Sequence, residues 1–408
     1  MNRKEFLNQA TYDAEKADHW WWQRERQYGL SRRELMRLLA VGTGAAALGT
    51  IPSLGGGSAR AEEAPIIKPV PPNLFYLHGT NAETRFEAFK GTGYYTSNDL
   101  FFVRNHSSTP RIDASTWRLR IEGDAVRTPI ELTYDQLRSM PSRTETKAIE
   151  CAGNFRSQFE VLHNIKVAGT PWRSGAIGVA EWKGVSLWRV LQRAGLEKSA
   201  VDFMPWGLDS KQVRRPLPIA LGLADDTLLV YEMNGKPLMP DHGYPVRLLT
   251  PGWVGVCNVK WVGKIEVSKS PLYSDWNTKT YVLIGPDYPS KPVVTTQNVK
   301  AAFELPWDGT LQAGRHTLTG RAWSGLGKIA RVDVSFDGGG TWLPATLDKR
   351  NIPQAWVQFS IPWAAKPGSH HLMARATDSR GNTQPMTIPF NEQGYLFGAV
   401  AKHPITVA

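Results

Sequence analysis

The sequence has little cysteine. Its 408 residues include only Cys151 and Cys257, which excludes a disulfide-rich scaffold, although one bridge between the two stays open. There is no C-x-x-C redox pair and no C-x-x-C-H motif, so this chain carries no covalently attached c-type haem. Cysteine and histidine also do not cluster at the spacing of a zinc site.

Long apolar runs and long basic runs are missing as well. The chain has 48 Lys+Arg against 37 Asp+Glu, a net charge of +11, but its basic residues occur singly or in pairs. Nucleic-acid binding is therefore not expected. No G-x-G-x-x-G motif is present, which argues against a dinucleotide-binding fold. What is abundant is apolar material, 41% of the residues with 16 Trp, which excludes global disorder.

Residues 1–61 have the pattern of an export leader. Paired arginines in "SRRELMR" (31–37) precede the run "LLAVGTGAAALGTI", which is too short and too rich in glycine for a membrane span of ~20 residues. The triplet Ala59-Arg60-Ala61 resembles a signal-peptidase site. The pattern predicts export through the twin-arginine machinery and a periplasmic location. That route carries folded proteins, which favours a cofactor inserted before export. A helix start with a chance Arg-Arg pair is the alternative.

The remaining chain divides into a lead-in and two domains. Residues 62–75 are rich in proline, and residues 76–285 mix short strands with a few helices, so they predict an α+β domain. We expect a strand over 117–123 and a helix over 185–196. Residues 284–294 form a linker. Residues 290–408 predict an all-β, immunoglobulin-like sandwich.

One feature of the sandwich allows a different interpretation. Its segment "SFDGGGTW" (335–342) resembles the Asp-box turn of sialidases, a structural hairpin that recurs on several β folds. A glycosidase would need a pair of carboxylates, and the sequence nominates none. A carbohydrate-binding module stays open as an alternative for residues 290–408.

Cys151 lies in an Ala-Gly-Asn turn with Arg156 close behind it. A thiolate attacks carbon, exchanges sulfur or holds a soft metal. The chain shows no local signature of a cysteine hydrolase and no second cysteine at redox spacing. Arg156 and the turn amides would favour a thiolate, and one thiolate does not make a zinc site. What is left is a metal whose other ligands come from an organic cofactor.

The segment "ECAGN" (150–154), followed by Arg156, resembles the molybdenum-ligand motif of the sulfite oxidase family of molybdopterin enzymes. The resemblance extends over about residues 70–400. It is carried in order by "FFVRNH" (101–106), "GLDS" (207–210), "YEMNGKPL" (231–238), "DHGYPVRLLTPGWVG" (241–255) and "NVKWVGKIEV" (258–267). It implies a sulfite oxidase-type mixed α/β molybdopterin-binding domain over 76–285. The sandwich resembles the family's dimerisation domain, which implies a homodimer.

The resemblance also implies roles for individual residues. Cys151 would be the protein ligand to molybdenum. The residues at the family's cofactor-contacting positions are Arg104, His106, Asp209, His242, Arg247 and Lys260. The residues at its catalytic positions are Arg104, Arg156 and Tyr281. Arginine suits such a site because its planar fork holds phosphate or an oxyanion in fixed geometry. Cys257 falls where the family needs no cysteine, so we expect it to be buried in the core.

At two positions the chain departs from the pattern of sulfite oxidases, and both positions bear on the choice of substrate. Phe155 stands where many sulfite oxidases have a second arginine, and Gln393 stands near the position of a substrate-channel arginine. The resemblance favours sulfite as the small oxyanion substrate, with electrons passed to an external c-type cytochrome or haem subunit. The same cofactor acting on carrier-bound sulfane sulfur, S-oxides or nitrate is the first alternative. The second is an exported, non-enzymatic β-sandwich binding protein with a structural disulfide.

Overall fold

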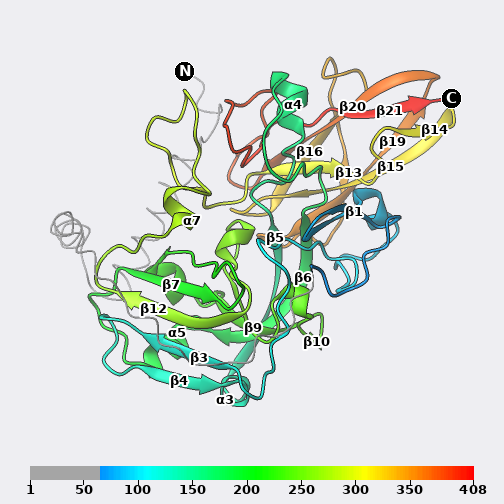
Figure 1. Ribbon diagram of the computed structural model, residues 1–408. Helices are drawn as coiled ribbons and strands as arrows, with labels where there is room; N and C mark the ends of the chain where they lie inside the picture. Colours follow the sequence, from blue (N-terminus) through cyan, green and yellow to red (C-terminus); the bar gives the residue numbers. More distant parts are fainter. Residues whose placement is uncertain (1–64) are drawn as a thin grey trace.

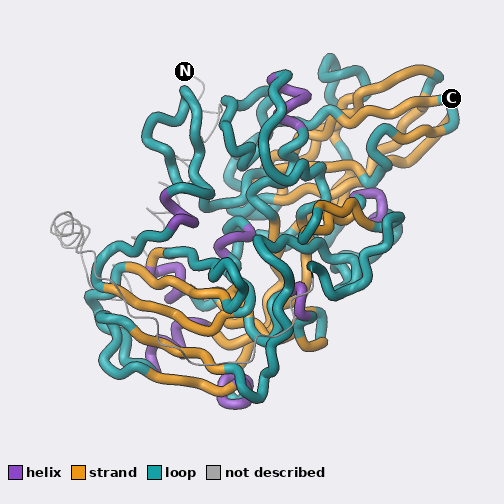
Figure 2. Tube along the Cα trace, in the orientation of Figure 1, coloured by secondary structure: helices purple, strands orange, loops and turns teal. Residues whose placement is uncertain are grey.

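The computed structural model describes residues 65–408, so the predicted leader over 1–61 lies outside the described residues. Figure 1 shows two halves, a mixed half that ends near α7 and a sandwich of long strands that carries the C-terminus. Strands and loops make up most of the fold, and the helices are short (Figure 2). Within residues 65–408 no helix is both long and apolar enough to cross a membrane.

The first half contains two five-stranded sheets and a small hairpin of β1 and β2. In one sheet β5 pairs with β6, β6 with β9, and β9 with both β10 and β11. In the other the order is β4-β3-β12-β7-β8, and the β3–β12 pair is parallel. The strands are β1 (Phe75–His78), β2 (Asn81–Thr84), β3 (Arg118–Glu122), β4 (Ile130–Thr133), β5 (Ser142–Glu150), β6 (Ile177–Ser186), β7 (Asp202–Gly207), β8 (Leu217–Pro218), β9 (Leu228–Met233), β10 (Lys236–Pro237), β11 (Arg247–Leu249) and β12 (Val262–Ser268).

Short helices and turns connect these strands. Helix α3 begins at a capping box in which the Thr133 hydroxyl accepts from the Gln136 amide, a sequence signal that fixes a helix start. The helical segments are η1 (Phe86–Phe89), α3 (Tyr134–Arg138), α4 (Gln158–His163), α5 (Leu187–Arg193), α6 (Ile219–Leu223), η2 (Pro240–His242), η3 (Gly255–Cys257) and α7 (Asp275–Thr278).

The second half is a sandwich of two sheets, ordered β13-β15-β19-β18 and β14-β21-β20-β16-β17. Val332 and Val334 of β16 are buried in the core between them, with Phe359 of β19 and Leu372 of β20. The strands are β13 (Lys300–Phe303), β14 (Gly309–Leu311), β15 (Gly314–Trp323), β16 (Ile329–Ser335), β17 (Leu343–Pro344), β18 (Thr346–Leu347), β19 (Trp356–Ala365), β20 (Gly368–Asp378) and β21 (His403–Val407). The predicted fold class, an α+β domain followed by an all-β sandwich, is confirmed.

A shared aromatic core joins the two halves. It contains Phe89 and Phe159 from the first half and Trp323 and Trp356 from the sandwich, each with less than 1% of its surface exposed. Full burial of one large apolar side chain stabilises by roughly 1.5–3 kcal/mol, so four such residues make the halves a single packed unit. The loops that carry the cysteine turn are therefore held against the sandwich.

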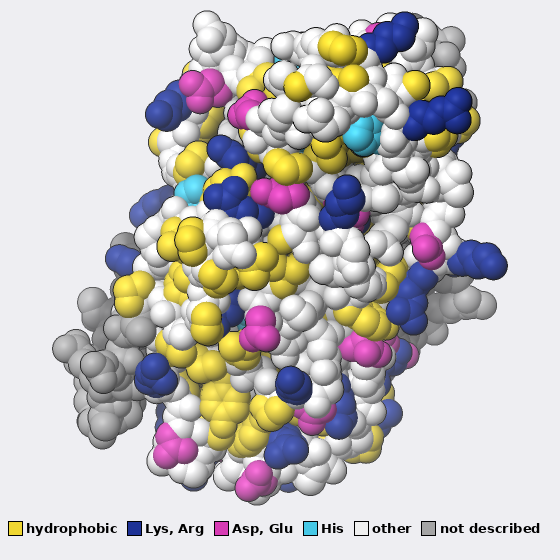
Figure 3. Space-filling model, turned by 90° about the vertical axis from the view of Figure 1, so that its right-hand side faces the viewer, with side chains coloured by type: hydrophobic (Ala, Val, Ile, Leu, Met, Phe, Trp, Pro, Cys, Tyr) yellow, Lys and Arg dark blue, Asp and Glu magenta, His cyan; other side chains and the backbone are white. Residues whose placement is uncertain are grey.

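The surface charge is dispersed. On the face drawn in Figure 3, Lys and Arg lie singly or in small groups among acidic, hydrophobic and uncharged side chains. This arrangement agrees with the scattered basic residues of the sequence and offers no continuous phosphate track on that face.

Candidate active site

A cavity lies between the ends of several loops of the first half. All the predicted site residues except Arg156 line it, although they come from positions far apart in the chain. Those that line it are Arg104, His106, Cys151, Asp209, His242, Arg247, Lys260 and Tyr281.

Cys151 sits at the end of β5, in a turn that presents a buried thiol to the cavity. The residue is 4% exposed. Its amide donates to the Ala176 carbonyl at 2.9 Å, and the Gly153 amide approaches its Sγ at 3.4 Å. A backbone N–H directed at sulfur is a contact that suits a cysteine which binds a metal.

Neither cysteine of the chain is in a disulfide. The bridge left open by the sequence is therefore not formed in the structure. Cys257 is fully buried in the core of the first half, as expected.

Arg104, His106 and Tyr281 form one contact group on the cavity wall. The His106 Nε2 and the Tyr281 hydroxyl share a hydrogen bond of 2.8 Å. Burial works against the charge of Arg104, but its interactions with Tyr281 and Cys151 outweigh that effect and raise the pKa of the guanidinium. Burial, with Arg104 and Lys260 nearby, holds the pKa of His106 well below its usual value. His106 is therefore neutral at neutral pH.

Tyr281 is strongly held. Its φ of 53° lies in the left-handed region, its side chain is 3% exposed, and its ring stacks on Tyr395 with centroids 4.9 Å apart. Burial raises the pKa of its phenol, so the hydroxyl keeps its proton at neutral pH and is available as a donor.

Arg156 lies beside the cavity rather than on its wall. Its Nε donates to the Gln393 carbonyl at 3.1 Å and its Nη1 to the Thr170 carbonyl at 2.9 Å. Its guanidinium lies 5.1 Å from the Tyr395 ring, which stacks on Tyr281. Arg156 thus adds positive electrostatic potential to the cavity from behind the stacked rings of Tyr395 and Tyr281.

Gly153 lies directly against the Arg156 guanidinium. A Cβ at this residue would lie 2.7 Å from Nη2 and 2.8 Å from Cζ of that guanidinium. A side chain at Gly153 would therefore displace the arginine.

Asp209 and Lys260 form a neighbouring part of the wall. The Asp209 carboxylate accepts from the Val213 amide at 3.0 Å and from the Ser107 hydroxyl at 3.3 Å. Lys260 Nζ donates to the Asp241 carbonyl at 2.8 Å and to the Asn105 side chain. Burial, together with Arg247, holds the pKa of Lys260 well below its usual value.

His242 and Arg247 are both buried in the cavity wall. The Arg247 Nη1 donates to the His242 carbonyl at 3.0 Å and its Nη2 to the Asn258 carbonyl at 3.1 Å, and its buried Nε has no hydrogen-bond partner. Burial lowers the pKa of Arg247 to about 9. His242 Nε2 contacts the Asn98 carbonyl at 3.0 Å, and burial keeps its pKa well below the usual value.

These residues fit a molybdenum–pterin group. One buried thiol can bind a soft metal. A pterin carries a phosphate and polar ring atoms, and the cavity lining includes the basic side chains of Arg104, Arg247 and Lys260, which can donate to them.

Sequence reasoning missed several residues that shape the cavity. Asn105, Asp241 and Trp261 line it, and each is adjacent in sequence to a predicted residue. Tyr395 stacks on Tyr281 from a loop distant in sequence. The quoted motifs contained a signal for the first three, since neighbours of a cofactor contact lie in the same loop. Nothing local indicated Tyr395.

Phe155 does not face the cavity. It is 3% exposed, its φ is 67°, and its ring stacks with Trp323 and Phe397, both at 6.3 Å. The Phe155 side chain therefore packs in the aromatic core, and the effect on the substrate of lacking an arginine at this position stays a prediction. The Gln393 side chain also bonds elsewhere, because its Nε2 donates to the Lys279 carbonyl at 3.1 Å.

Comparison with known proteins agrees with the fold and the site. The family model for the oxidoreductase molybdopterin binding domain matches residues 106–276, and that for the Mo-co oxidoreductase dimerisation domain matches residues 287–406. Sulfite oxidase of Gallus gallus is 37% identical over 331 residues, which cover 74% of this chain and 71% of that protein. Mitochondrial sulfite oxidase of Homo sapiens is 37% identical over 331 residues, covering 75% and 60%. The chain thus spans about three fifths of the length of the mammalian mitochondrial relatives.

A solved structure is similar as well. The sulfane dehydrogenase SoxCD from Paracoccus pantotrophus superposes with a TM-score of 0.70 and 28% identity, covering 78% of this chain and 82% of that one. A molybdopterin-binding oxidoreductase domain followed by its dimerisation domain defines the class of protein. Within that class, the chain belongs to the sulfite oxidase family of molybdenum cofactor-dependent oxidoreductases. The predicted family and cofactor are confirmed.

Proposed function

We propose that this protein is a sulfite dehydrogenase, which oxidises sulfite to sulfate and passes the electrons to an external c-type cytochrome or haem subunit. The observation that carries the proposal is the meeting of one buried thiol, Cys151, with the cations Arg104, Arg247 and Lys260 in one cavity. This combination suits a molybdenum cofactor and a small oxyanion. The 37% identity to sulfite oxidases supports the choice of substrate.

The predicted roles divide among the residues that line the cavity. Cys151 would bind molybdenum, and Asp209, His242, Arg247 and Lys260 would hold the pterin and its phosphate. When bound, the cofactor supplies two-electron oxygen-atom transfer, which no side chain performs. The remaining work falls to the protein, namely substrate binding, orientation and hydrogen bonding.

The substrate would bind near Arg104 and Tyr281. Arg104 keeps its charge at all pH values of interest because its pKa is raised. Arg156 adds positive charge from behind the stacked Tyr395. The Tyr281 phenol would donate to an oxyanion oxygen, and neutral His106 would hold it in place through their 2.8 Å hydrogen bond.

The cellular setting belongs to the same proposal. The twin-arginine pattern over 31–37 supports export of the folded holoenzyme to the periplasm, where c-type cytochromes reside. The match to a dimerisation domain over 287–406 supports a homodimer.

The decisive experiment is sulfite-dependent reduction of cytochrome c or ferricyanide by protein whose molybdenum content is near one atom per chain. Turnover at micromolar sulfite, lost in Cys151→Ser with the fold intact, is the expected result. No turnover at full molybdenum occupancy would overturn sulfite as the substrate. Retained turnover in Cys151→Ser would overturn the metal-ligand role.

A second substrate class has one observation in its favour. The likeness to a sulfane dehydrogenase, at 28% identity, keeps carrier-bound sulfane sulfur as the alternative. Turnover with a persulfide carried on a protein cysteine, without turnover on sulfite, would establish it. S-oxides and nitrate are tested in the reductive direction with the same preparation.

A further inference from the structure

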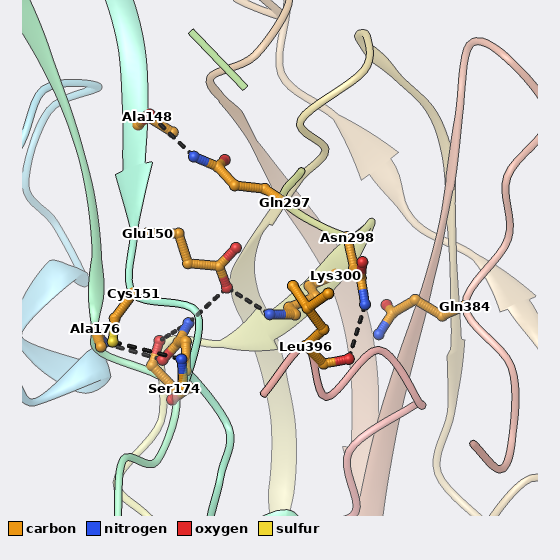
Figure 4. Close-up of polar contacts among 12 residues, drawn as sticks. Ala148, Glu150, Cys151, Ser174, Ala176, Gln297, Asn298, Lys300, Gln384 and Leu396 are labelled. Atoms are coloured by element: carbon orange, nitrogen blue, oxygen red, sulfur yellow. Dashed lines mark hydrogen bonds and ion pairs between the residues drawn. The ribbon is translucent and has the colours of Figure 1, made fainter. Parts of the chain in front are cut away.

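A buried ion pair joins the sandwich to the cysteine turn. Lys300 Nζ lies 2.7 Å from Glu150 Oε1, and the two side chains are 2% and 1% exposed. Glu150 ends β5 and directly precedes Cys151, whereas Lys300 begins β13 of the sandwich. Figure 4 shows the Glu150 carboxylate between the two halves, with Lys300 reaching it from the sandwich side.

The contact continues from Glu150 into the turn. Asn154 Nδ2 donates to the same Glu150 Oε1 at 3.0 Å, and Asn154 Oδ1 accepts from the Ala176 amide at 3.1 Å. The Ala176 carbonyl in turn accepts from the Cys151 amide at 2.9 Å. The carboxylate therefore fixes the Asn154 amide group, and through it Ala176, the residue just before β6 that holds the backbone of the cysteine.

Two further hydrogen bonds tie the turn and its strand to the second half of the chain. Gln297 Nε2 donates to the Ala148 carbonyl of β5 at 3.3 Å, and the Leu396 amide donates to the Ala152 carbonyl at 2.8 Å. The Leu396 carbonyl accepts from Asn298 at 2.8 Å. The backbone on both sides of the cysteine is thus held by segments that belong to the sandwich half.

An ion pair at this depth is not explained by stability alone. Replacing a buried pair with apolar side chains of similar volume is often neutral or stabilising, and polar pairs can instead specify one geometry. Here the ion pair would specify the geometry of the turn that carries Cys151, the residue directly after Glu150.

We propose that Glu150 and Lys300 are positioning residues for the Cys151 thiol, so that the dimerisation domain completes the metal site. This inference rests on the proposed role of Cys151 as the molybdenum ligand. Lys300 contacts neither the cavity lining nor the cofactor contacts, and it acts through Glu150 and Asn154.

The test uses the double variant Glu150→Gln/Lys300→Met, which removes one charge of each sign and leaves no unpaired ion. Its matched control is Glu304→Gln/Arg321→Met. That pair is equally buried, with Nε and Oε1 2.7 Å apart, but Arg321 contacts the Phe89 carbonyl rather than the cysteine turn. Lys300→Arg serves as the conservative variant.

Three quantities are measured on full-length chains. They are the alkylation rate of Cys151 in cofactor-free protein, the molybdenum content of holoenzyme, and the g-values of its Mo(V) electron paramagnetic resonance signal. We expect Cys151 to be alkylated about tenfold faster in the double variant than in the control. The size of the effect is that of losing one buried hydrogen bond, here the one between Lys300 and Glu150. We also expect lower molybdenum content and shifted g-values, with Lys300→Arg close to wild type.

An alkylation rate and g-values equal to those of the control would overturn the inference, since a merely structural pair predicts equal effects. Failure of the proposed function is recognised separately. Wild-type protein expressed with cofactor would then hold no molybdenum, whereas the alkylation rates would still decide whether the pair positions the thiol.

Discussion

Replacing Phe155 with arginine tests which way this residue faces. The change would restore the paired arginines of many sulfite oxidases, and if the side chain faced the substrate it would strengthen the anion pocket. The structure instead buries the ring between Trp323 and Phe397. Loss of a buried phenylalanine is unfavourable by about 3–5 kcal/mol.

The incoming charge adds to that loss. Lys300 Nζ lies 5.9 Å from the Phe155 ring centroid. Two positive charges at about 6 Å repel by roughly 3 kcal/mol at an effective dielectric constant of about 20, and Glu150 offsets part of this repulsion. The two effects add to about 3–8 kcal/mol, so we expect Phe155→Arg to unfold roughly 6–16 °C below wild type, at about 2 °C per kcal/mol for a chain of this size.

Calorimetry measures the melting temperature, and steady-state assays with sulfite and ferricyanide measure KM. Phe155→Leu, which keeps an apolar side chain, is the control and should lose much less stability. KM for sulfite should stay within about twofold of wild type in both variants, because neither side chain reaches the cavity. An unchanged melting temperature with a KM several-fold lower would refute the burial of residue 155.

Three further predictions follow from single groups. Tyr281→Phe removes the hydroxyl that bonds His106, and kcat/KM should fall about tenfold to a hundredfold while molybdenum content stays constant, because a charge-assisted hydrogen bond is worth roughly 1.5–3 kcal/mol. Lys260→Met should accelerate cofactor loss during dialysis, followed as pterin fluorescence, by a similar factor; a rate equal to wild type would remove Lys260 from the cofactor contacts. Burial raises the pKa of Asp202 from 3.8 to about 6, so its ionisation favours the unfolded chain and destabilises the fold increasingly as pH rises through this window. Asp202→Asn should therefore melt higher than wild type at about pH 8 and lose that advantage near pH 4, as read from melting curves across pH.

Many of the strands could be predicted from the alternation of apolar and polar residues along the sequence. Arg118–Glu122 and Ile329–Ser335 are strands where apolar and polar residues alternate, because a half-buried strand shows a period of two. The predicted helix over 185–196 is shorter, Leu187–Arg193, since Val185 pairs with Leu229 in the sheet. Tertiary pairing overrode local propensity at that end.

The sequence predicted which residues belong to the site, but it did not predict how their side chains are oriented. The motifs that carry the family resemblance named most of the residues that line the cavity. Orientation is a different matter, since it depends on contacts far apart in sequence. Phe155 and Arg156 are adjacent, yet one packs on Trp323 and the other donates to the Gln393 carbonyl. No local pattern distinguishes these two directions.

The charge of the site bears on substrate choice. Arg156 donates its Nε and Nη1 hydrogens to backbone carbonyls and lies against Tyr395, so it contributes mainly positive electrostatic potential to the site. Arg104 and Tyr281 are left as the groups on the wall that can point donors at an oxyanion. A dianion gains from both the potential and the donors, whereas a neutral S-oxide gains from the donors alone. Burial deepens this difference because Coulomb attraction strengthens in a low dielectric. The Gln393 carbonyl thus holds in place an arginine whose positive potential favours a dianion.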